Sequence, residues 1–356
     1  MAQIREVTEE KVIKEFTNHH VETQVQHSLE WKEIVEKTYK NCHPHYYIKE
    51  ESNKITALFP FFLIRSKLFG NRIISIPFLD TGGFIGKYDE ANIKEVMRQL
   101  NRNIQKIKHI EIRLDERSID FTKIRQILLK NSFKEDCSKQ QARISLTSKE
   151  EMWKKFHKHT RNDIRKAEKS GLKIKKIENK EELDQFYKLY LKEMHNFGTP
   201  QHAKKIFENL KNIMKEKFFG LNCYFNEKLI GSSIAIYFNK EGNILFNVSD
   251  KKYKQYHPND LLYWETIQWA TKNKVNYLNL GQVEKVTDQN SRAHGLYKFK
   301  LKWLSEVHPR HYFYYRFGEK QENKKESYKS FRKLWRFIPN PILKKVGVKI
   351  CSELGI

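Results

Sequence analysis

The first half of the chain alternates between amphipathic stretches and short apolar runs. Apolar residues recur at helical spacing in the amphipathic stretches, whereas the apolar runs have the length and composition of buried strands. Helices are therefore predicted over residues 8–40, 89–106 and 121–131, and strands over residues 55–65, 71–79, 109–115 and 142–146. In the strand at 109–115, Ile110, Ile112 and Leu114 share one face, and Glu111 and Arg113 share the other. Helices interleaved with strands favour a layered α+β or α/β fold.

The second half of the chain begins with a helix signal. Ser148 followed three residues later by Glu151 is a capping-box pattern, and Gly171 ends the helix that this pattern starts. Further helices are predicted over residues 180–196 and 201–216 and strands over residues 218–225, 228–238, 243–249 and 275–281. The first three of these strands are separated by short turn-like pieces and predict an antiparallel meander. The next helix begins near Asn259, its predicted N-cap.

Composition adds an expectation about size and partners. A chain of 356 residues exceeds what one core usually supports, so two domains are expected. The apolar fraction of 39%, with 13% aromatic residues, is enough for packed cores and excludes a disordered tether. The formal net charge of +25 implies an anionic partner such as nucleic acid, a phosphorylated substrate or an acidic membrane. The alternative is a lysine-rich composition with no specific meaning.

The reactive residue types form no recognisable catalytic or metal-binding motif. The four cysteines, Cys42, Cys137, Cys223 and Cys351, are far apart, which argues against a disulfide scaffold or a thiolate zinc site and fits a reducing cytoplasm. The histidine pairs lack other ligands at metal-binding spacing, so no metal site is expected. Glycine-rich phosphate motifs and G-x-S-x-G are absent, which excludes the simplest nucleotide-binding and serine-hydrolase interpretations. No activated nucleophile stands out, so direct transfer within a ternary complex is favoured.

Two segments are strongly basic. Residues 153–177 hold ten Lys or Arg against two acids, and Arg161 and Arg165, one helical turn apart, are expected to present their guanidinium groups to one phosphate-like anion. A solvated helix face is the alternative. Residues 327–350 hold seven Lys or Arg and no acid, with interleaved aromatic residues. That pattern is typical of a helix on an anionic membrane surface, and a helix docked on the protein body is the alternative.

The N-terminal residues and the apolar runs bear on location. The charged N-terminus lacks the apolar core of a signal peptide, and no run approaches the ~18 apolar residues that a membrane span needs. A monomer without a transmembrane segment is expected in the cytoplasm, with peripheral contact at the inner face of the membrane if the basic tail binds lipid.

Several long segments resemble FemAB-like proteins, in particular the branch associated with exopolysaccharide and exosortase systems, whose domains are described as BioF2-like or GNAT-like acetyltransferases. The matching segments, in chain order, are ALFPFFLIRSKLFGNRIISIPFLDTGGFIG at 57–86, HIEIRLDER at 109–117, the helix RNDIRKAEKSG at 161–171, MHNFGTP at 194–200, HPNDLLYWETIQWA at 257–270 and HGLYKFKLKW at 294–303. The predicted order of a meander followed by helix, strand, helix and strand is also that of the GNAT acyltransferase core. The resemblance covers most of the chain.

The resemblance implies an α+β fold of two tandem GNAT-like domains, each with a mixed, mostly antiparallel sheet flanked by helices. The expected division is an N-terminal domain at 1–140, a C-terminal catalytic domain at 141–318 and a basic amphipathic tail at 319–356. No permanently bound cofactor is expected, since the co-substrate is aminoacyl-tRNA or acyl-CoA. Better-known relatives transfer amino acids from aminoacyl-tRNA to the peptide of a lipid-linked peptidoglycan precursor.

The site residues are likewise implied by the resemblance. The lysine of the family's Phe-Lys pair is thought to stabilise the developing oxyanion, which assigns that role to Lys300 with Phe299 as its neighbour, while Lys298 and Lys302 become surface or substrate-steering charges. Substrate or phosphate binding is assigned to Arg161, Arg165, Lys166, Asn259, Tyr263 and Gly281. The sequence departs from the family at Gln282-Val283, where an Arg-Ser pair is expected, so donor and acceptor identity do not transfer.

Three functions follow as alternatives. The first is an N-acyltransferase or aminoacyltransferase that modifies an amine of a peptidoglycan or polysaccharide precursor of the cell envelope, without a covalent enzyme intermediate. The second is an acyl-CoA-dependent N-acetyltransferase acting on a small molecule. The third is a non-catalytic module that binds RNA or anionic lipid through its basic surface. The usual pyrophosphate loop of CoA-binding GNAT proteins is not obvious after the meander, which favours aminoacyl-tRNA or an atypical donor.

Overall fold

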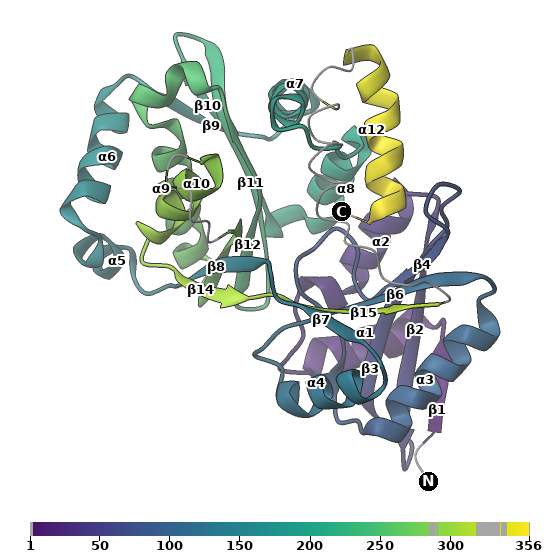
Figure 1. The fold of residues 1–356 in the computed structure, drawn as a ribbon. Helices are drawn as coiled ribbons and strands as arrows, with labels where there is room; N and C mark the ends of the chain where they lie inside the picture. The colour runs from purple at the N-terminus through teal and green to yellow at the C-terminus, as the bar shows by residue number, and fades with distance from the viewer. Residues whose placement is uncertain (1–2, 285–288, 290, 318–334, 336–339, 356) are drawn as a thin grey trace. The chain divides into compact units, whose positions relative to one another are not determined.

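The computed structural model describes residues 3–284, 289, 291–317, 335 and 340–355, of which 340–345 are described by their backbone alone. The chain divides into two compact units. Unit 1 comprises Met1–Ser138, Pro309–Lys324 and Val348–Ile356, and unit 2 comprises Lys139–His308 and Lys325–Gly347. Each unit is a mixed sheet flanked by helices, so the predicted α+β class is confirmed (Figure 1). The boundaries expected at 140 and 318 stay a prediction. Most of the predicted basic tail lies outside the described residues.

Unit 1 is built on an eight-stranded sheet with the order β1-β2-β3-β4-β6-β15-β7, and β5 pairs with β3. Its strands are β1 (Gln3–Val7), β2 (Cys42–Glu51), β3 (Lys54–Ile64), β4 (Asn71–Ile74), β5 (Ile85–Gly86), β6 (Ile107–Leu114), β7 (Lys134–Asp136) and β15 (His311–Arg316). Its helices are α1 (Glu10–His19), α2 (Leu29–Thr38), α3 (Glu90–Asn103) and α4 (Phe121–Lys130). One core lies between the sheet and α3 and α4, and a smaller one includes α1.

The alternating apolar and charged residues of strand β6 occupy its two opposite faces. Ile110, Ile112 and Leu114 enter the core beneath α3 and α4, as the period of two predicts. The opposite face is buried as well, and there Glu111 pairs with Arg113 at 2.6 Å. Buried charges of this kind need partners, and the ion pair supplies them.

Unit 2 is built on a seven-stranded sheet with the order β14-β8-β13-β12-β11-β10-β9. Its strands are β8 (Gln140–Ser145), β9 (Lys173–Lys176), β10 (Phe218–Phe225), β11 (Lys228–Phe238), β12 (Glu241–Ser249), β13 (Tyr277–Val283) and β14 (Glu306–Pro309). Its helices are α5 (Lys149–Lys155), α6 (Lys158–Lys169), α7 (Lys180–Phe197), α8 (Lys204–Met214), α9 (Pro258–Lys272) and α10 (Arg292–Leu301). Helices α5, α6, α9 and α10 cover one face of the sheet, and α7 and α8 cover the other (Figure 1). The predicted meander is confirmed as β10–β12.

Two details of the predicted helices were wrong. The helix expected from Ser148 to Gly171 is divided into α5 and α6, because Phe156 is extended (ψ 140°) and its ring packs edge-on against Trp264 and Trp303. Helix α9 begins at Pro258 with His257 as its N-cap, so the N-cap lies two residues before the expected position, Asn259. Proline suits the first helical position because it has no N–H to donate there.

The last described helix, α12 (Asn340–Leu354), ends in unit 1. The hydroxyl of Ser66 donates to Glu353 at 2.6 Å, and the N–H of Phe78 donates to the carbonyl of Gly355 at 3.1 Å. Cys351 is buried. The final residues of the described chain are therefore docked on unit 1, and the choice between a membrane-surface helix and a docked helix for residues 327–350 stays open. No helix among the described residues combines the length and the apolar character that a membrane crossing requires.

Candidate active site

The lysine singled out by the family resemblance, Lys300, lies on helix α10. Ser291 caps α10, its hydroxyl accepting from the N–H of His294 at 3.2 Å. The segment YKFKLKW, residues 297–303, is thus helical up to Leu301, although its alternation of lysines with apolar residues would also suit a solvated strand face. Lys300 is 6% exposed, and its ammonium donates to the carbonyl oxygen of Gln282 at 2.9 Å. A lysine is seldom this buried unless it is paired or functional, so its environment marks a site.

Strand β13 bends where the Lys300 ammonium reaches it. Gly281 adopts φ +83°, and the register with β8 shifts between Asn279 and Gly281, which makes a β-bulge. The N–H of Gly281 donates to the side-chain oxygen of Asn279 at 2.8 Å. A Cβ built on Gly281 would lie 3.2 Å from the Lys300 Nζ. Glycine is needed here for both its backbone conformation and its lack of a side chain.

Strands β12 and β13 separate from each other next to this bulge. Strands β12 and β13 pair in parallel only from Glu241 to Asn243 and from Tyr277 to Asn279, although they continue to Ser249 and Val283. The bulge at Gly281 and the Lys300 ammonium follow directly on the last paired residues. A backbone that leaves its ladder has N–H and C=O groups available for a ligand. The candidate active site is therefore the point at which β12 and β13 diverge.

The aromatic residues beside Lys300 form the core that holds α10. Phe299 meets the ring of Tyr263 edge-on, with centroids 5.0 Å apart, and Tyr263 stacks on Trp303 at 5.6 Å. Tyr263 is buried, and burial raises the pKa of its hydroxyl. These residues fix the helix that presents Lys300. The structure thus places Phe299 and Tyr263 in packing contacts, and their predicted roles in catalysis and substrate binding stay predictions.

Lys302 has a structural environment, in contrast to the surface role expected for it. Its ammonium pairs with Asp163 of α6 at 2.9 Å and also with Asp260 of α9. The Nδ1 of His257 lies 3.6 Å from the Oδ1 of Asp163 and 3.5 Å from the Oδ2 of Asp260. The hydroxyl of Thr160 donates a hydrogen bond to the carbonyl oxygen of Lys302. This cluster ties α6, α9 and the end of α10 together.

The arginines of the basic helix have different surroundings. Arg161 donates to the carbonyl oxygen of Lys154 at 3.2 Å, so it satisfies the last turn of α5. Arg165 is exposed, with its guanidinium carbon 5.4 Å from the ring centroid of Trp153, and Lys166 is exposed as well. Only the last two side chains are directed to solvent. The phosphate-binding role predicted for the group therefore fits Arg165 and Lys166 better than Arg161.

Asn259 lies at the start of α9 and faces the meander. Its side-chain oxygen accepts a hydrogen bond from the amide of Asn247 in β12 at 3.0 Å. Asn247 belongs to the part of β12 beyond the ladder with β13. Asn259 therefore contacts the strand that borders the candidate site.

One acidic residue at this end of unit 2 was missed by sequence reasoning. Glu193 of α7 is 1% exposed, and it accepts a hydrogen bond from the amide of Asn196 at 3.1 Å. Burial raises the pKa of its carboxyl group, while the charges of Lys192 and Arg292 act in the opposite direction. The only sequence signal was its position immediately before Met194 of the Met-x-x-x-Gly-Thr-Pro element.

Contacts of its neighbours place the end of α7, where Glu193 lies, beside the end of β12 and the start of α10. The preceding residue, Lys192, pairs at 2.7 Å with Asp250, which follows the last residue of β12. Phe197, one turn later, has the guanidinium carbon of Arg292 3.2 Å above its ring centroid, and Arg292 is the first residue of α10. The end of α7 thus touches both the exit of β12 and the start of the helix that carries Lys300.

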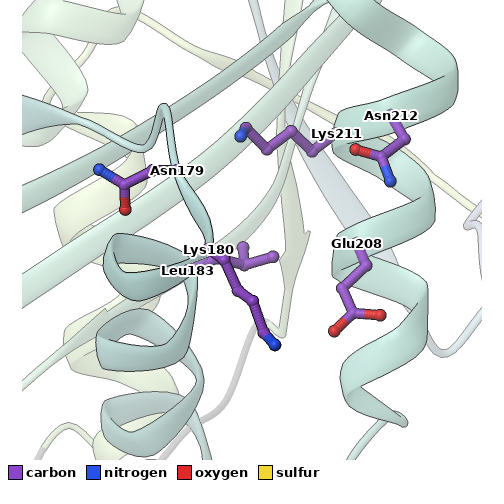
Figure 2. Close-up of a pocket in the computed structure, with 6 residues that line it drawn as sticks. All are labelled: Asn179, Lys180, Leu183, Glu208, Lys211 and Asn212. Carbon is purple, nitrogen blue, oxygen red and sulfur yellow. The ribbon is translucent and has the colours of Figure 1, made fainter.

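A surface hollow of about 320 Å³ lies at the opposite end of α7. Figure 2 shows its lining side chains: Asn179, Lys180, Leu183, Glu208, Lys211 and Asn212. Leu183 precedes Glu193 by ten residues, which is about 15 Å along a helix. The hollow is therefore a feature separate from the candidate active site.

Comparison with known proteins agrees with this geometry. Residues 154–300 match the model of the acetyltransferase (GNAT) domain, a range that runs from α5 to Lys300. A search of curated proteins gives no match. The match identifies residues 154–300 as a GNAT-type acetyltransferase domain, which supports an acyltransferase.

Several solved structures have folds similar to most of the chain. It is similar to the crystal structure of FemX, with a TM-score of 0.71 and 12% identity over 93% of this chain and 100% of that one. A tandem GNAT protein from the clavulanic acid biosynthesis pathway gives a TM-score of 0.59 and 6% identity over 90% and 100% of the two chains. The structure of L-PGS from Bacillus licheniformis gives 0.52 and 12% over 87% and 96%. At these identities the likeness defines the fold, and the predicted tandem GNAT-like architecture is confirmed.

Proposed function

We propose that the protein transfers an acyl or aminoacyl group from an ester or thioester donor to an amine of a cell-envelope precursor. The observation that carries the proposal is the buried Lys300 ammonium at the bulge of β13, beside the point where β12 leaves the ladder. A fixed cation in a water-poor site is suited to stabilise a developing oxyanion. The resemblance of the Phe-Lys pair to that of FemAB-like proteins supports the same role.

The proposed reaction proceeds in a ternary complex. The acceptor amine attacks the donor carbonyl carbon, the C–N bond forms, and the negative charge that develops on oxygen is stabilised by Lys300. Glu193 is the candidate base that takes the proton from the attacking nitrogen, because it is a buried carboxylate at the end of α7, where Phe197 contacts Arg292 at the start of α10. The C–O or C–S bond then breaks, and the leaving hydroxyl or thiol receives a proton.

The two donor classes have different support. The GNAT domain match favours acyl-CoA. The net charge of +25 and the exposed Arg165 and Lys166 on α6 favour a larger anion, and aminoacyl-tRNA is the donor that the FemAB resemblance implies. The FemAB resemblance implies an acceptor in the cell envelope, whereas similarity to the clavulanic acid pathway protein supports a small-molecule acceptor.

A donor screen tests the proposal. Thermal stability of the purified chain is measured with acetyl-CoA, longer acyl-CoAs and charged or uncharged tRNA, and productive pairs are incubated with amine-bearing envelope precursors and with small amines. Mass spectrometry should show acceptors heavier by one acyl or aminoacyl group. A chain that is stabilised by RNA or by anionic vesicles in a salt-sensitive manner, and that modifies no acceptor with any donor, would support the non-catalytic alternative instead.

A further inference from the structure

Three metal-ligand residue types meet on one face of adjacent strands in unit 1. Strands β7 and β15 are antiparallel, with Tyr312 opposite Asp136 and Phe313 opposite Glu135. Continued by one residue past the end of β7, the same register sets His311 opposite Cys137. Glu135 and Cys137 are two residues apart, so their side chains leave the same face of the strand. The register brings the imidazole of His311 to that face as the cross-strand neighbour.

The ligand atoms of these side chains converge. The Nδ1 of His311 is 2.7 Å from the Oε1 of Glu135 and 3.3 Å from the Sγ of Cys137. All three atoms lie within 4.8 Å of one another. His311 is buried and Cys137 is exposed, so the cluster is held on one side and open on the other.

Neighbouring side chains orient two of the three ligands. The ring of Phe121 lies against the imidazole of His311, with centroids 4.5 Å apart. Arg125 donates from Nε to both oxygens of Glu135 at 2.9 and 3.0 Å, and its Nη2 lies 2.7 Å from Oε2. A carboxylate oxygen has two lone pairs, so Oε1 can accept from Arg125 and still face an ion. Ligating carboxylates are commonly hydrogen-bonded in this way.

We propose that Glu135, Cys137 and His311 form a binding site for a zinc ion, with a fourth coordination position open to water or to an external ligand. One thiolate, one imidazole and one carboxylate are all zinc ligands, and three protein ligands with an open position are typical of accessible sites. At zinc–ligand distances of about 2.0–2.3 Å, tetrahedral geometry separates ligand atoms by roughly 3.3–3.6 Å. The 2.7 Å separation between the His311 Nδ1 and the Glu135 Oε1 would widen by about 0.6 Å, and the 3.3 Å separation between Nδ1 and the Cys137 Sγ by about 0.2 Å.

A second cluster of potential metal ligands among the described residues already holds a cation, the ammonium of Lys302. Asp163, His257 and Asp260 also lie within reach of one another, but the ammonium of Lys302 pairs with both carboxylates. An ion there would have to displace a lysine that is anchored in the helix core. In the cluster of Glu135, Cys137 and His311, the cation Arg125 contacts the carboxylate of Glu135. Zinc could therefore bind the thiol of Cys137 and the imidazole of His311 without displacing Arg125.

Cobalt(II) titration of the tag-free full chain tests the site, since cobalt in thiolate coordination gives a charge-transfer band in the near ultraviolet. We expect one equivalent of cobalt or zinc to bind per chain. Cys137→Ser should abolish the band, and His311→Gln should weaken zinc binding at least tenfold. Arg125→Gln should weaken it about 10–100-fold, as loss of an outer-shell partner does. Asp136→Asn, at the adjacent residue on the other face of β7, is the matched control and should bind like the wild type.

Alkylation of Cys137 gives a measurement on the unmodified chain. One equivalent of zinc should slow its alkylation by a thiol reagent, read by peptide mass mapping, while the buried Cys223 serves as the internal reference. No cobalt band in the wild type, a band that survives Cys137→Ser, or alkylation that is indifferent to zinc would overturn the assignment. None of these results depends on acyl transfer.

Discussion

Replacing Lys300 by methionine removes the charge that we propose stabilises the oxyanion and retains most of the side-chain volume. The side chain is buried and its ammonium is held 2.9 Å from the Gln282 carbonyl, so the cation is positioned before the substrate binds. Loss of one such donor costs about 10²–10³-fold in kcat, or about 2.7–4 kcal/mol of transition-state stabilisation. We expect a decrease of that size in Lys300→Met. Lys300→Arg should not restore activity, because a planar fork cannot occupy the position of a compact ammonium.

Steady-state kinetics with saturating donor and acceptor measures the effect, and donor binding is followed separately by thermal shift. The substitution leaves the Gln282 carbonyl without this partner, which costs about 1–3 kcal/mol if water does not replace it. Circular dichroism and unfolding curves therefore accompany the kinetics. Lys298→Ala is the matched control, since Lys298 is exposed two residues earlier on the same helix. A folded Lys300→Met protein that keeps more than about a tenth of the wild-type kcat would refute the role of the ammonium in the transition state.

Two further substitutions test the surroundings of Lys300. Gly281→Ala should destabilise unit 2 by about 1–2 kcal/mol, because φ +83° is unfavourable for alanine. It should also lower kcat, because the new Cβ would lie 3.2 Å from the Lys300 Nζ. Unfolding curves measure the first effect, and steady-state kinetics measure the second. Glu193→Gln should remove the acidic limb of the pH–rate profile, since a base with a raised pKa loses activity as the pH falls through that pKa. Because the folded-state pKa exceeds the unfolded-state value, ionisation of Glu193 destabilises the fold as the pH rises, so Glu193→Gln should be at least as stable as the wild type at neutral pH. Glu181→Gln, on the exposed start of α7, is the control, and an unchanged pH profile in an otherwise active Glu193→Gln protein would exclude the base.

Periodicity predicted most of unit 2 because its elements are regular and strongly patterned. The meander, α9 and β13 follow in the predicted order. The same method missed β2, whose sequence CHPHYYIKEE mixes polar and aromatic residues and has no clean alternation. It also joined α5 to α6, since a break that depends on the packing of Phe156 against two tryptophans leaves no signal in local spacing.

The candidate sites were less accessible to sequence reasoning. Lys300 was identified through family resemblance, whereas the bulge that brings Gly281 to its ammonium is a property of strand pairing. Glu193 looks like any acid on an amphipathic helix until its burial is known. Cys137 and His311 are 174 residues apart in the chain, so motif spacing argued against a thiolate metal site that strand register makes plausible.

The three alternating lysines of YKFKLKW show why the type of element matters for function. In a strand, Lys298, Lys300 and Lys302 would share one face and form a single basic stripe. A helix turns by about 100° per residue, so Lys300 is directed about 200° away from Lys298, and Lys302 returns to within about 40° of Lys298. Accordingly Lys298 is exposed, Lys300 reaches the bulge of β13, and Lys302 anchors the helix end to Asp163. Of these three lysines, Lys300 alone is both buried and directed to the diverging strands, so the helix separates it from the other two and makes it the one for which we propose a role in catalysis.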